Sequence, residues 1–247
     1  MNLEGLNNRQ LEAIENLDGP MLVLAGAGSG KTKVLTSRIA NLIENGISPH
    51  NILAITFTNK AAGEMKERVE KLVEHDGQQV WIATFHSTCV RILRRYADRL
   101  GYDTNFTIYD TDDQKTVMKD ICKRLNIDTK MFKERTILGA ISGAKDELIS
   151  PMQYAMDAMG DFQKRKIADA YTEYQAILKK NNAMDFDDLL VNTYKLLNNN
   201  EEIRSKYSQR FAYILVDEYQ DTNYVQYLLV NRLTMPQQNI CVVGDDA

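Results

Sequence analysis

A glycine-rich segment carries the most specific chemical pattern in this sequence. Residues 25–32 read AGAGSGKT, follow an apolar run and precede a helical pattern. Glycines in such a loop let backbone N–H groups surround phosphate oxygens, and the start of the next helix adds positive potential. In this pattern Lys31 reaches the β- and γ-phosphates of a nucleotide, and the Thr32 hydroxyl binds Mg²⁺. Ala25 replaces the first glycine of the usual pattern, and the simpler alternative is a flexible turn before a helix.

Acidic residues form a second candidate site, far along the chain. The apolar run YILV at 213–216 ends in Asp217 and Glu218, and Gln220 follows shortly after. At the tip of a strand, Asp217 could hold Mg²⁺ through water, and Glu218 could orient or activate an attacking water molecule. Acidic residues after a strand are also common in solvated loops and helix caps. The glycine loop earlier in the chain is what favours the catalytic interpretation.

Gln10 has two interpretations, and the spacing leaves both open. It ends the segment LNNRQ, which precedes the glycine loop. A carboxamide can pair with N6 and N7 of adenine. The spacing Asn7-x-x-Gln10 also matches a helix capping box, in which Gln10 would have a purely structural role.

Two further segments combine an aromatic ring with polar side chains. Residues 56–60 read TFTNK and residues 84–87 read TFHS, each directly after an apolar run. In an open parallel sheet both loops emerge at the carboxyl edge, on the same side as the glycine loop. Bases of single-stranded nucleic acid stack on aromatic rings while hydroxyls and amides contact phosphates. Judged by residue type alone, Phe57 and Phe85 are more often core residues.

Five apolar runs rich in β-branched residues predict the strands that position these segments. Because the runs lack polar alternation, they are typical of strands buried on both faces of a parallel sheet. Helical patterns at residues 33–45, 61–74 and 86–100 separate the first three runs, which indicates βαβ units and an α/β fold. The predicted strands are Met21–Ala25, Ile52–Phe57, Val80–Ala83, Tyr213–Val216 and Ile240–Val243.

The middle of the chain follows a different pattern. Residues 105–185 hold almost no strand signal and several helical patterns, one behind an expected capping box at 111–114 and one over about 161–180. We therefore expect an α/β segment over 1–104, a helical insert over 105–185 and a second α/β segment over 186–247. The chain ends just past a predicted core strand, so we expect it to be a shortened form of the domain.

Composition narrows the class of protein further. The 247 residues are 44% hydrophobic and carry a formal net charge of −4, which excludes a uniformly basic nucleic-acid coat but not a local basic groove. The three cysteines are scattered and form no disulfide framework, and the three histidines form no metal-ligand pair. We recognise neither a signal peptide nor a membrane span. These features predict a cytoplasmic protein without a structural metal.

Six segments, in this order and spacing, resemble the UvrD/PcrA/Rep family of superfamily 1A ATP-dependent DNA helicases, and PcrA-type sequences most closely. They read LNNRQ, AGAGSGKT, ITFTNKAA, ATFHS, DFDDLL and ILVDEYQD, and the resemblance covers essentially the whole chain. It implies a P-loop NTPase fold with a RecA-like parallel sheet flanked by helices and an inserted all-helical subdomain. Motors of this family have two RecA-like domains, hydrolyse ATP and move along single-stranded DNA, typically 3′→5′, in DNA repair or replication.

The resemblance also assigns roles to individual residues, motif by motif. It implies that Gln10 reads adenine, that Gln220 links the nucleotide state to the rest of the motor, and that the segment 185–188 is mainly structural. Lys33 stands where close relatives have an arginine that stacks near the base, and lysine lacks that planar surface. The implied ATP-binding residues are Gln10, Ala27, Gly28, Ser29, Gly30, Lys31, Thr32 and Lys33. The implied catalytic residues are Lys31, Asp217, Glu218 and Gln220, with Thr32 and Asp217 holding Mg²⁺. The implied DNA contacts are Phe57, Thr58, Asn59, Thr84, Phe85 and His86.

The family pattern continues beyond the residues of this sequence. A glutamine that senses the γ-phosphate follows the segment that begins at 244–246, and the second RecA-like domain supplies arginines that can raise turnover roughly 10³–10⁵-fold. We therefore expect this chain to bind ATP, Mg²⁺ and single-stranded DNA or single–double-strand junctions as a monomer away from membranes, but to hydrolyse ATP poorly. Three alternatives remain: a motor subunit of a RecB/AddA-type helicase-nuclease, a P-loop ATPase that is not a DNA motor, and a non-enzymatic binding module.

Overall fold

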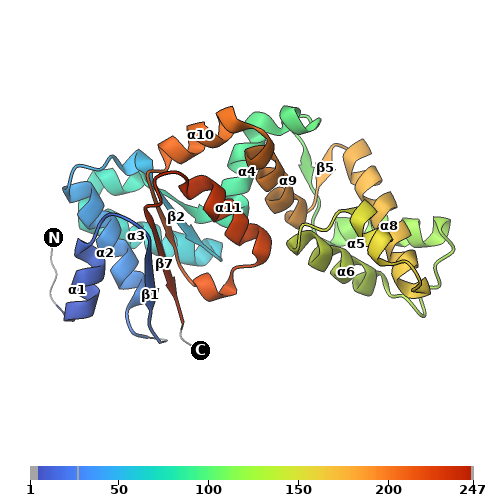
Figure 1. Cartoon of the computed structure of the whole chain (residues 1–247), viewed down its shortest axis with the longest axis horizontal. Helices are drawn as coiled ribbons and strands as arrows, with labels where there is room; N and C mark the ends of the chain where they lie inside the picture. Colours follow the sequence, from blue (N-terminus) through green and yellow to red (C-terminus); the bar gives the residue numbers. More distant parts are fainter. Residues whose placement is uncertain (1–4, 27, 246–247) are drawn as a thin grey trace. The chain divides into compact units, whose positions relative to one another are not determined.

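The computed structural model describes residues 5–26 and 28–245 and divides the chain into two compact units (Figure 1). The sheet unit comprises Met1–Thr88, Leu197–Thr222 and Gln226–Ala247. The helical unit comprises Cys89–Leu196 with Asn223–Val225 and contains the predicted insert at 105–185. The chain passes from the sheet unit to the helical unit within α4 (Phe85–Tyr96) and returns within α9 (Phe186–Asn199).

Five parallel strands form the sheet of the sheet unit, and each corresponds to one of the predicted apolar runs. They are β1 (Met21–Leu24), β2 (Ile52–Thr56), β3 (Trp81–Thr84), β6 (Tyr213–Val216) and β7 (Ile240–Gly244), in the spatial order β1-β7-β6-β2-β3. The register pairs Thr56 with Thr84 and Leu24 with Gly244, so the loops after these strands meet at one edge. The structure confirms the prediction of a parallel α/β sheet flanked by helices.

Helices cover the sheet through their apolar faces. Leu35 and Ile39 of α2 (Lys31–Glu44) and Met65 and Val69 of α3 (Asn59–Val73) pack into one buried cluster with β2, β6 and β7. The other helices of this unit are α1 (Asn8–Glu15), α10 (Glu201–Arg210), most of α11 (Tyr224–Thr234) and the short turns η1 (Pro49–Asn51), η2 (Glu74–Gln79) and η4 (Tyr219–Asp221).

The edge strand β1 departs from the predicted burial on both faces. Its residues alternate, and Leu22 and Leu24 are 60% and 57% exposed. Leu22 and Leu24 are two positions apart and therefore lie on one face of β1, so this face is uncovered, whereas β3 at the other end of the sheet is mostly buried. The central strand β2 is buried along its whole length, as predicted.

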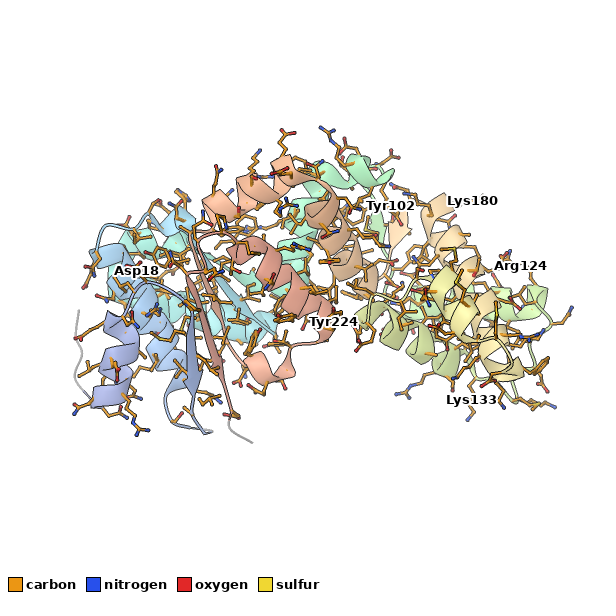
Figure 2. The ribbon with its side chains drawn as sticks, viewed as in Figure 1. Asp18, Tyr102, Arg124, Lys133, Lys180 and Tyr224 are labelled. Carbon is orange, nitrogen blue, oxygen red and sulfur yellow. The ribbon has the colours of Figure 1, made fainter. Side chains whose placement is uncertain are left out.

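Besides most of α4 and α9, the helical unit contains four helices and two very short strands. These elements are α5 (Thr111–Arg124), α6 (Glu134–Asp146), α7 (Pro151–Asp157), α8 (Phe162–Lys180), β4 (Thr107–Ile108) and β5 (Ala183–Met184), preceded by η3 (Ala97–Leu100). Met118 and Ile121 of α5, Ile141 of α6 and Tyr174 of α8 form the centre of its core. Charged side chains such as Arg124, Lys133 and Lys180 are exposed on this unit (Figure 2).

Two details of the helical unit differ from the sequence analysis. The capping box of α5 begins one residue earlier than expected, because the Asp110 carboxylate accepts from the backbone N–H groups of Asp112 and Asp113. The insert is also not purely helical, since β4 and β5 pair in parallel where the insert begins and ends. Two-residue strands are too short to produce a recognisable apolar run.

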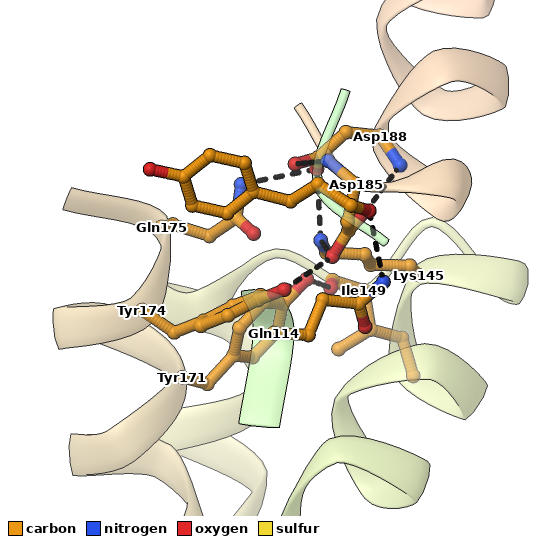
Figure 3. Close-up of polar contacts among 9 residues, drawn as sticks. Gln114, Lys145, Ile149, Tyr171, Tyr174, Gln175, Asp185 and Asp188 are labelled. Atoms are coloured by element: carbon orange, nitrogen blue, oxygen red, sulfur yellow. Dashed lines mark hydrogen bonds and ion pairs between the residues drawn. The ribbon is translucent and has the colours of Figure 1, made fainter. Parts of the chain in front are cut away.

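A buried ionic cluster joins three helices of this unit (Figure 3). The Lys145 ammonium on α6 lies 2.7 Å from Asp185 Oδ2 and 2.9 Å from Asp188 Oδ1, and all three side chains are about 2–3% exposed. Tyr174 OH donates to Asp185 Oδ2, and Gln175 Nε2 donates to Asp188 Oδ1. The segment 185–188 thus begins α9 inside the core, which fits the structural role expected for it.

The structure contains no helix with the length and apolar character required to traverse a bilayer, among residues 5–26 and 28–245.

Candidate functional site

The glycine-rich loop connects β1 to α2 in the geometry that phosphate binding needs. Gly28 and Gly30 have φ values of +75° and +87°, a region that residues with a side chain rarely adopt. A Cβ atom at Gly30 would also lie 3.1 Å from Gln10 Nε2. Gly30 is the N-cap of α2, so the loop delivers its backbone to the positive end of a helix. Ala27, one of the predicted ATP-binding residues, lies outside the described residues.

Lys31 begins α2 and is surrounded by carboxylates. Its side chain is 8% exposed, and its ammonium lies 3.6 Å from Glu218 Oε2 and in contact with Asp245 Oδ1. Anionic oxygens thus lie around this ammonium, which is the arrangement that nucleotide phosphates would supply. Asp245 is absent from the predicted site residues. The sequence feature that could have indicated Asp245 is its position directly after the strand β7, whose end lies at the same sheet edge as the glycine loop.

The predicted magnesium ligands are close together. Thr32 Oγ1 donates to Asp217 Oδ2 over 3.4 Å, although 185 positions separate the two residues in sequence. Asp217 is 5% exposed, and its backbone N–H donates to Ile55 O of β2, which holds the residue at the end of β6. A hydroxyl and a carboxylate are hard oxygen donors of the kind that Mg²⁺ prefers. The residues present thus fit a magnesium ion beside bound phosphates.

Glu218 and Gln220 form a hydrogen-bonded link between the acidic segment and the end of β7. Gln220 Nε2 donates to Glu218 Oε2 at 2.8 Å, and the Asp245 N–H donates to Gln220 Oε1 at 3.1 Å. Glu218 has a φ of +48°, which is rare for a residue with a side chain and turns the chain sharply after β6. The structure thus brings Lys31, Thr32, Asp217, Glu218 and Gln220 into one site.

The environment of Asp217 opposes its negative charge. Burial raises its pKa above the ordinary value of 3.8, and the nearby charge of Glu218 raises it further. The folded chain therefore holds this proton more tightly than the unfolded chain does. The resulting stabilisation is complete at low pH and is lost as the pH rises from 3.8 through the folded pKa.

Asp217→Asn is therefore expected to stabilise the chain without nucleotide at pH 7 and to weaken Mg²⁺-dependent nucleotide binding. An uncharged amide removes the cost of a buried charge and keeps one acceptor for Thr32, so we expect the Tm to rise by about 2–4 °C. Thermal unfolding at pH 7 and pH 5 tests this prediction, because the advantage should shrink in acid. A Tm below that of the unaltered chain at pH 7 would contradict it.

Gln10 takes part in a capping box and also contacts the glycine loop. Its Oε1 accepts from the Asn7 N–H, and its own N–H donates to Asn7 Oδ1, each at 2.9 Å. Its Nε2 also donates to Ser29 O over 2.9 Å. The capping interpretation is thus correct, and the amide still has one N–H and one lone pair for a base. Lys33 Nζ donates to Gly5 O at 3.4 Å, and the adenine roles of both side chains stay predictions.

The residues predicted to contact DNA lie where β2 leads into α3 and where β3 leads directly into α4. Thr58 and Asn59 are exposed, while Phe57 and His86 are half-buried. Phe85 is 3% exposed and meets Phe57 edge to face, with ring centroids 5.6 Å apart. The buried Thr84 caps α4 through the Ser87 N–H. In this structure Phe85 supports the ring of Phe57, and direct contacts of these six residues with DNA stay a prediction.

Phe57→Ala is expected to weaken binding of a single-stranded oligonucleotide by about 1–3 kcal/mol, the usual contribution of a base stacked on an aromatic ring. Fluorescence anisotropy at low salt measures this loss, with thermal unfolding of the same variant as the control. A large fall in Tm with unchanged DNA affinity would instead assign Phe57 to the core.

A glycine loop after an edge strand and a carboxylate pair after a central parallel strand together define a P-loop nucleotide-binding domain. The chain belongs to the UvrD/REP helicase N-terminal domain family, whose model matches residues 6–247. Over 244 residues it is 52% identical to the ATP-dependent DNA helicase PcrA of Staphylococcus aureus (strain Mu50 / ATCC 700699). Over the same length it is 54% identical to the ATP-dependent DNA helicase PcrA of Bacillus subtilis (strain 168). Each match covers 98% of this chain and 33% of the relative, so the chain spans about a third of their length. These findings confirm the family resemblance.

Proposed function

We propose that this chain is the first motor domain of an ATP-dependent DNA helicase that moves along single-stranded DNA. The observation that carries the proposal is the convergence of Lys31, Thr32, Asp217 and Glu218 at one sheet edge, with Lys31 Nζ 3.6 Å from Glu218 Oε2. The names of the relatives favour a helicase over a helicase-nuclease subunit or an unrelated ATPase. The motor domain comprises residues 1–104 and 186–247, and residues 105–185 form its insert.

Each residue of the site has a chemical task in this proposal. Lys31 and the loop N–H groups bind the β- and γ-phosphates, and the Gln10 amide recognises adenine. Glu218 accepts a proton from the attacking water, and Gln220, hydrogen-bonded to Glu218, senses the result. Mg²⁺ held by Thr32 and Asp217 would neutralise charge on the phosphates. A second motor domain in the longer protein would supply the arginines that complete the site.

DNA binding occupies the same edge of the sheet. A base would stack on Phe57, and the side chains of Thr58, Asn59 and His86 would contact phosphates. Because Thr56 and Thr84 are paired in register and β2 also pairs with β6, a nucleotide-driven shift at the ends of β2 and β6 would reach both DNA-binding segments.

The test is ATP binding, ATP turnover and oligonucleotide binding by the 247-residue chain, with Lys31→Ala as the control. We expect ATP and single-stranded DNA to bind, with negligible turnover, because in this proposal a second motor domain supplies the arginines that complete the site. ATP binding without any affinity for DNA would overturn the motor assignment in favour of a different P-loop ATPase. Brisk DNA-stimulated turnover that Lys31→Ala abolishes would overturn the assignment of part of the site to a second domain.

A further inference from the structure

A buried arginine on α2, the helix that follows the glycine loop, donates hydrogen bonds to backbone carbonyls at the end of α1. Arg38 lies on α2, two turns after Lys31, and is 2% exposed. Its Nη1 donates to Ala13 O at 2.7 Å and to Asn16 O, and its Nη2 donates to Leu17 O at 2.9 Å. One turn further along α2, Asn41 Nδ2 donates to Ile14 O at 2.9 Å. Two side chains of α2 thus bind four carbonyls at the C-terminal end of α1.

These contacts are favourable both for the Arg38 guanidinium and for the carbonyl groups at the end of α1. The last carbonyls of a helix have no partner within the helix, and the negative end of the helix dipole favours a cation. Burial lowers the pKa of Arg38, but a guanidinium remains charged at any physiological pH. The planar fork of the guanidinium suits several carbonyls at once, which the single nitrogen of lysine does not.

The other end of α1 carries Gln10. Gln10 lies in the first turn of the helix and contacts Ser29 O of the glycine loop. The side chain of Ile14, whose carbonyl accepts from Asn41, is completely buried. Gln10 and Ala13 are three positions apart, a rise of about 4.5 Å along the helix, so a change at the anchored end moves the carboxamide directly.

We propose that Arg38, assisted by Asn41, is the positioning residue that sets the register of Gln10 against the nucleotide base. The inference rests on the proposed function, in which the Gln10 amide reads adenine. Because Lys31 and Arg38 share α2, one helix then places both the phosphate contact and the base contact. Base selectivity depends on Arg38 although its guanidinium is buried against α1.

The experiment compares ATP and GTP binding by calorimetry. A carboxamide pairs with the N6 donor and N7 acceptor of adenine, whereas guanine has the acceptor O6 in place of the N6 amino group. Arg38→Met is expected to reduce the preference for ATP about tenfold, as Gln10→Ala does, with GTP affinity unchanged. Arg38→Lys should lose part of the preference. Met65→Ala, at a buried position of α3, is the matched control that lowers stability and leaves the preference intact.

A double-mutant cycle separates positioning from general damage. In the Gln10→Ala background, Arg38→Met should change the ATP preference no further, because the group it positions is gone. Two results would overturn the inference while leaving the adenine assignment intact. In the first, Arg38→Met lowers the preference for ATP further in the Gln10→Ala background. In the second, Arg38→Met alone leaves the preference for ATP unchanged. If Gln10→Ala itself retains the full preference for ATP, the adenine role in the proposed function fails and the inference fails with it. Should Arg38→Met not fold, Asn41→Ala removes one of the four contacts and is expected to give a smaller loss of the same kind.

Discussion

Lys31→Ala is expected to lower the affinity of this chain for ATP on the order of 100-fold while the fold is retained. The lysine lies at the start of α2, where its ammonium contacts the carboxylates of Glu218 and Asp245. When nucleotide binds, phosphate oxygens would replace these carboxylates as its partners. Without the ammonium, the phosphates would instead meet two uncompensated negative charges, so the loss exceeds that of one hydrogen bond.

Calorimetric titration with ATP and Mg²⁺ measures this loss. Lys66→Ala is the matched control, because Lys66 lies on α3, is half-exposed and makes only a 4.0 Å contact with Glu70. We expect circular dichroism spectra of both variants to match that of the unaltered chain. An ATP affinity within twofold of the unaltered chain would remove Lys31 from the phosphate site.

The strands of this fold were predictable because burial on both faces leaves a strong local pattern. The run Tyr213–Val216 was predicted with the bounds that the structure shows, and Ile52–Phe57 is one residue too long. Exposure of Leu22 and Leu24 was not predictable in this way. It depends on which faces of the sheet the other elements cover, since β3 at the opposite end of the sheet is mostly buried, and that cover is a property of the whole fold.

The site residues were predictable only where a motif fixes their chemistry. Lys31 and Asp217 belong to such motifs, and the structure places both at one sheet edge. Arg38 belongs to none, and its role depends on partners more than twenty positions away in sequence. Asp245 lies in the segment 244–246 that begins a further family motif, but no role was predicted for it. In a helical pattern Arg38 has no feature that separates it from a solvated arginine.

The capping box of α5 shows the limit of local rules in a smaller way. Asp110 and Thr111 are both good N-cap residues, so residue type alone does not choose between them. The backbone decides, because Asp110 is extended with a ψ of −177° and Thr111 is the first helical residue. A one-residue difference of this kind moves no core residue.

The second large effect is expected in the helical unit, from Lys145→Met. Lys145 neutralises two carboxylates at the start of α9, and each carboxylate uses its other oxygen to cap that helix (Figure 3). Removing the ammonium leaves two buried negative charges side by side, which we expect to cost about 3–5 kcal/mol of the free energy of unfolding. Total stabilities are only about 5–15 kcal/mol, so urea denaturation followed by fluorescence should show a much lower midpoint.

Two comparisons separate loss of charge balance from loss of packing. The variant Lys145→Met/Asp185→Asn/Asp188→Asn removes all three charges and keeps similar volumes and good capping residues, so it should recover most of the lost stability.

The pH dependence of stability is the second comparison. Burial raises the pKa of Asp188 even beside Lys145. The Lys145→Met chain should therefore regain stability as the pH falls from 7 to 5, because protonating one carboxylate removes the repulsion. In the unaltered chain, burial lowers the pKa of Lys145, but the charges of Asp188 and Asp185 outweigh it and raise the pKa above its usual range. The stabilisation from Lys145 is therefore complete below 10.5 and is lost only as the pH rises through the folded pKa. A triple variant as unstable as Lys145→Met would show that the lost stability does not come from charge balance, and the ionic role of Lys145 would have to be abandoned.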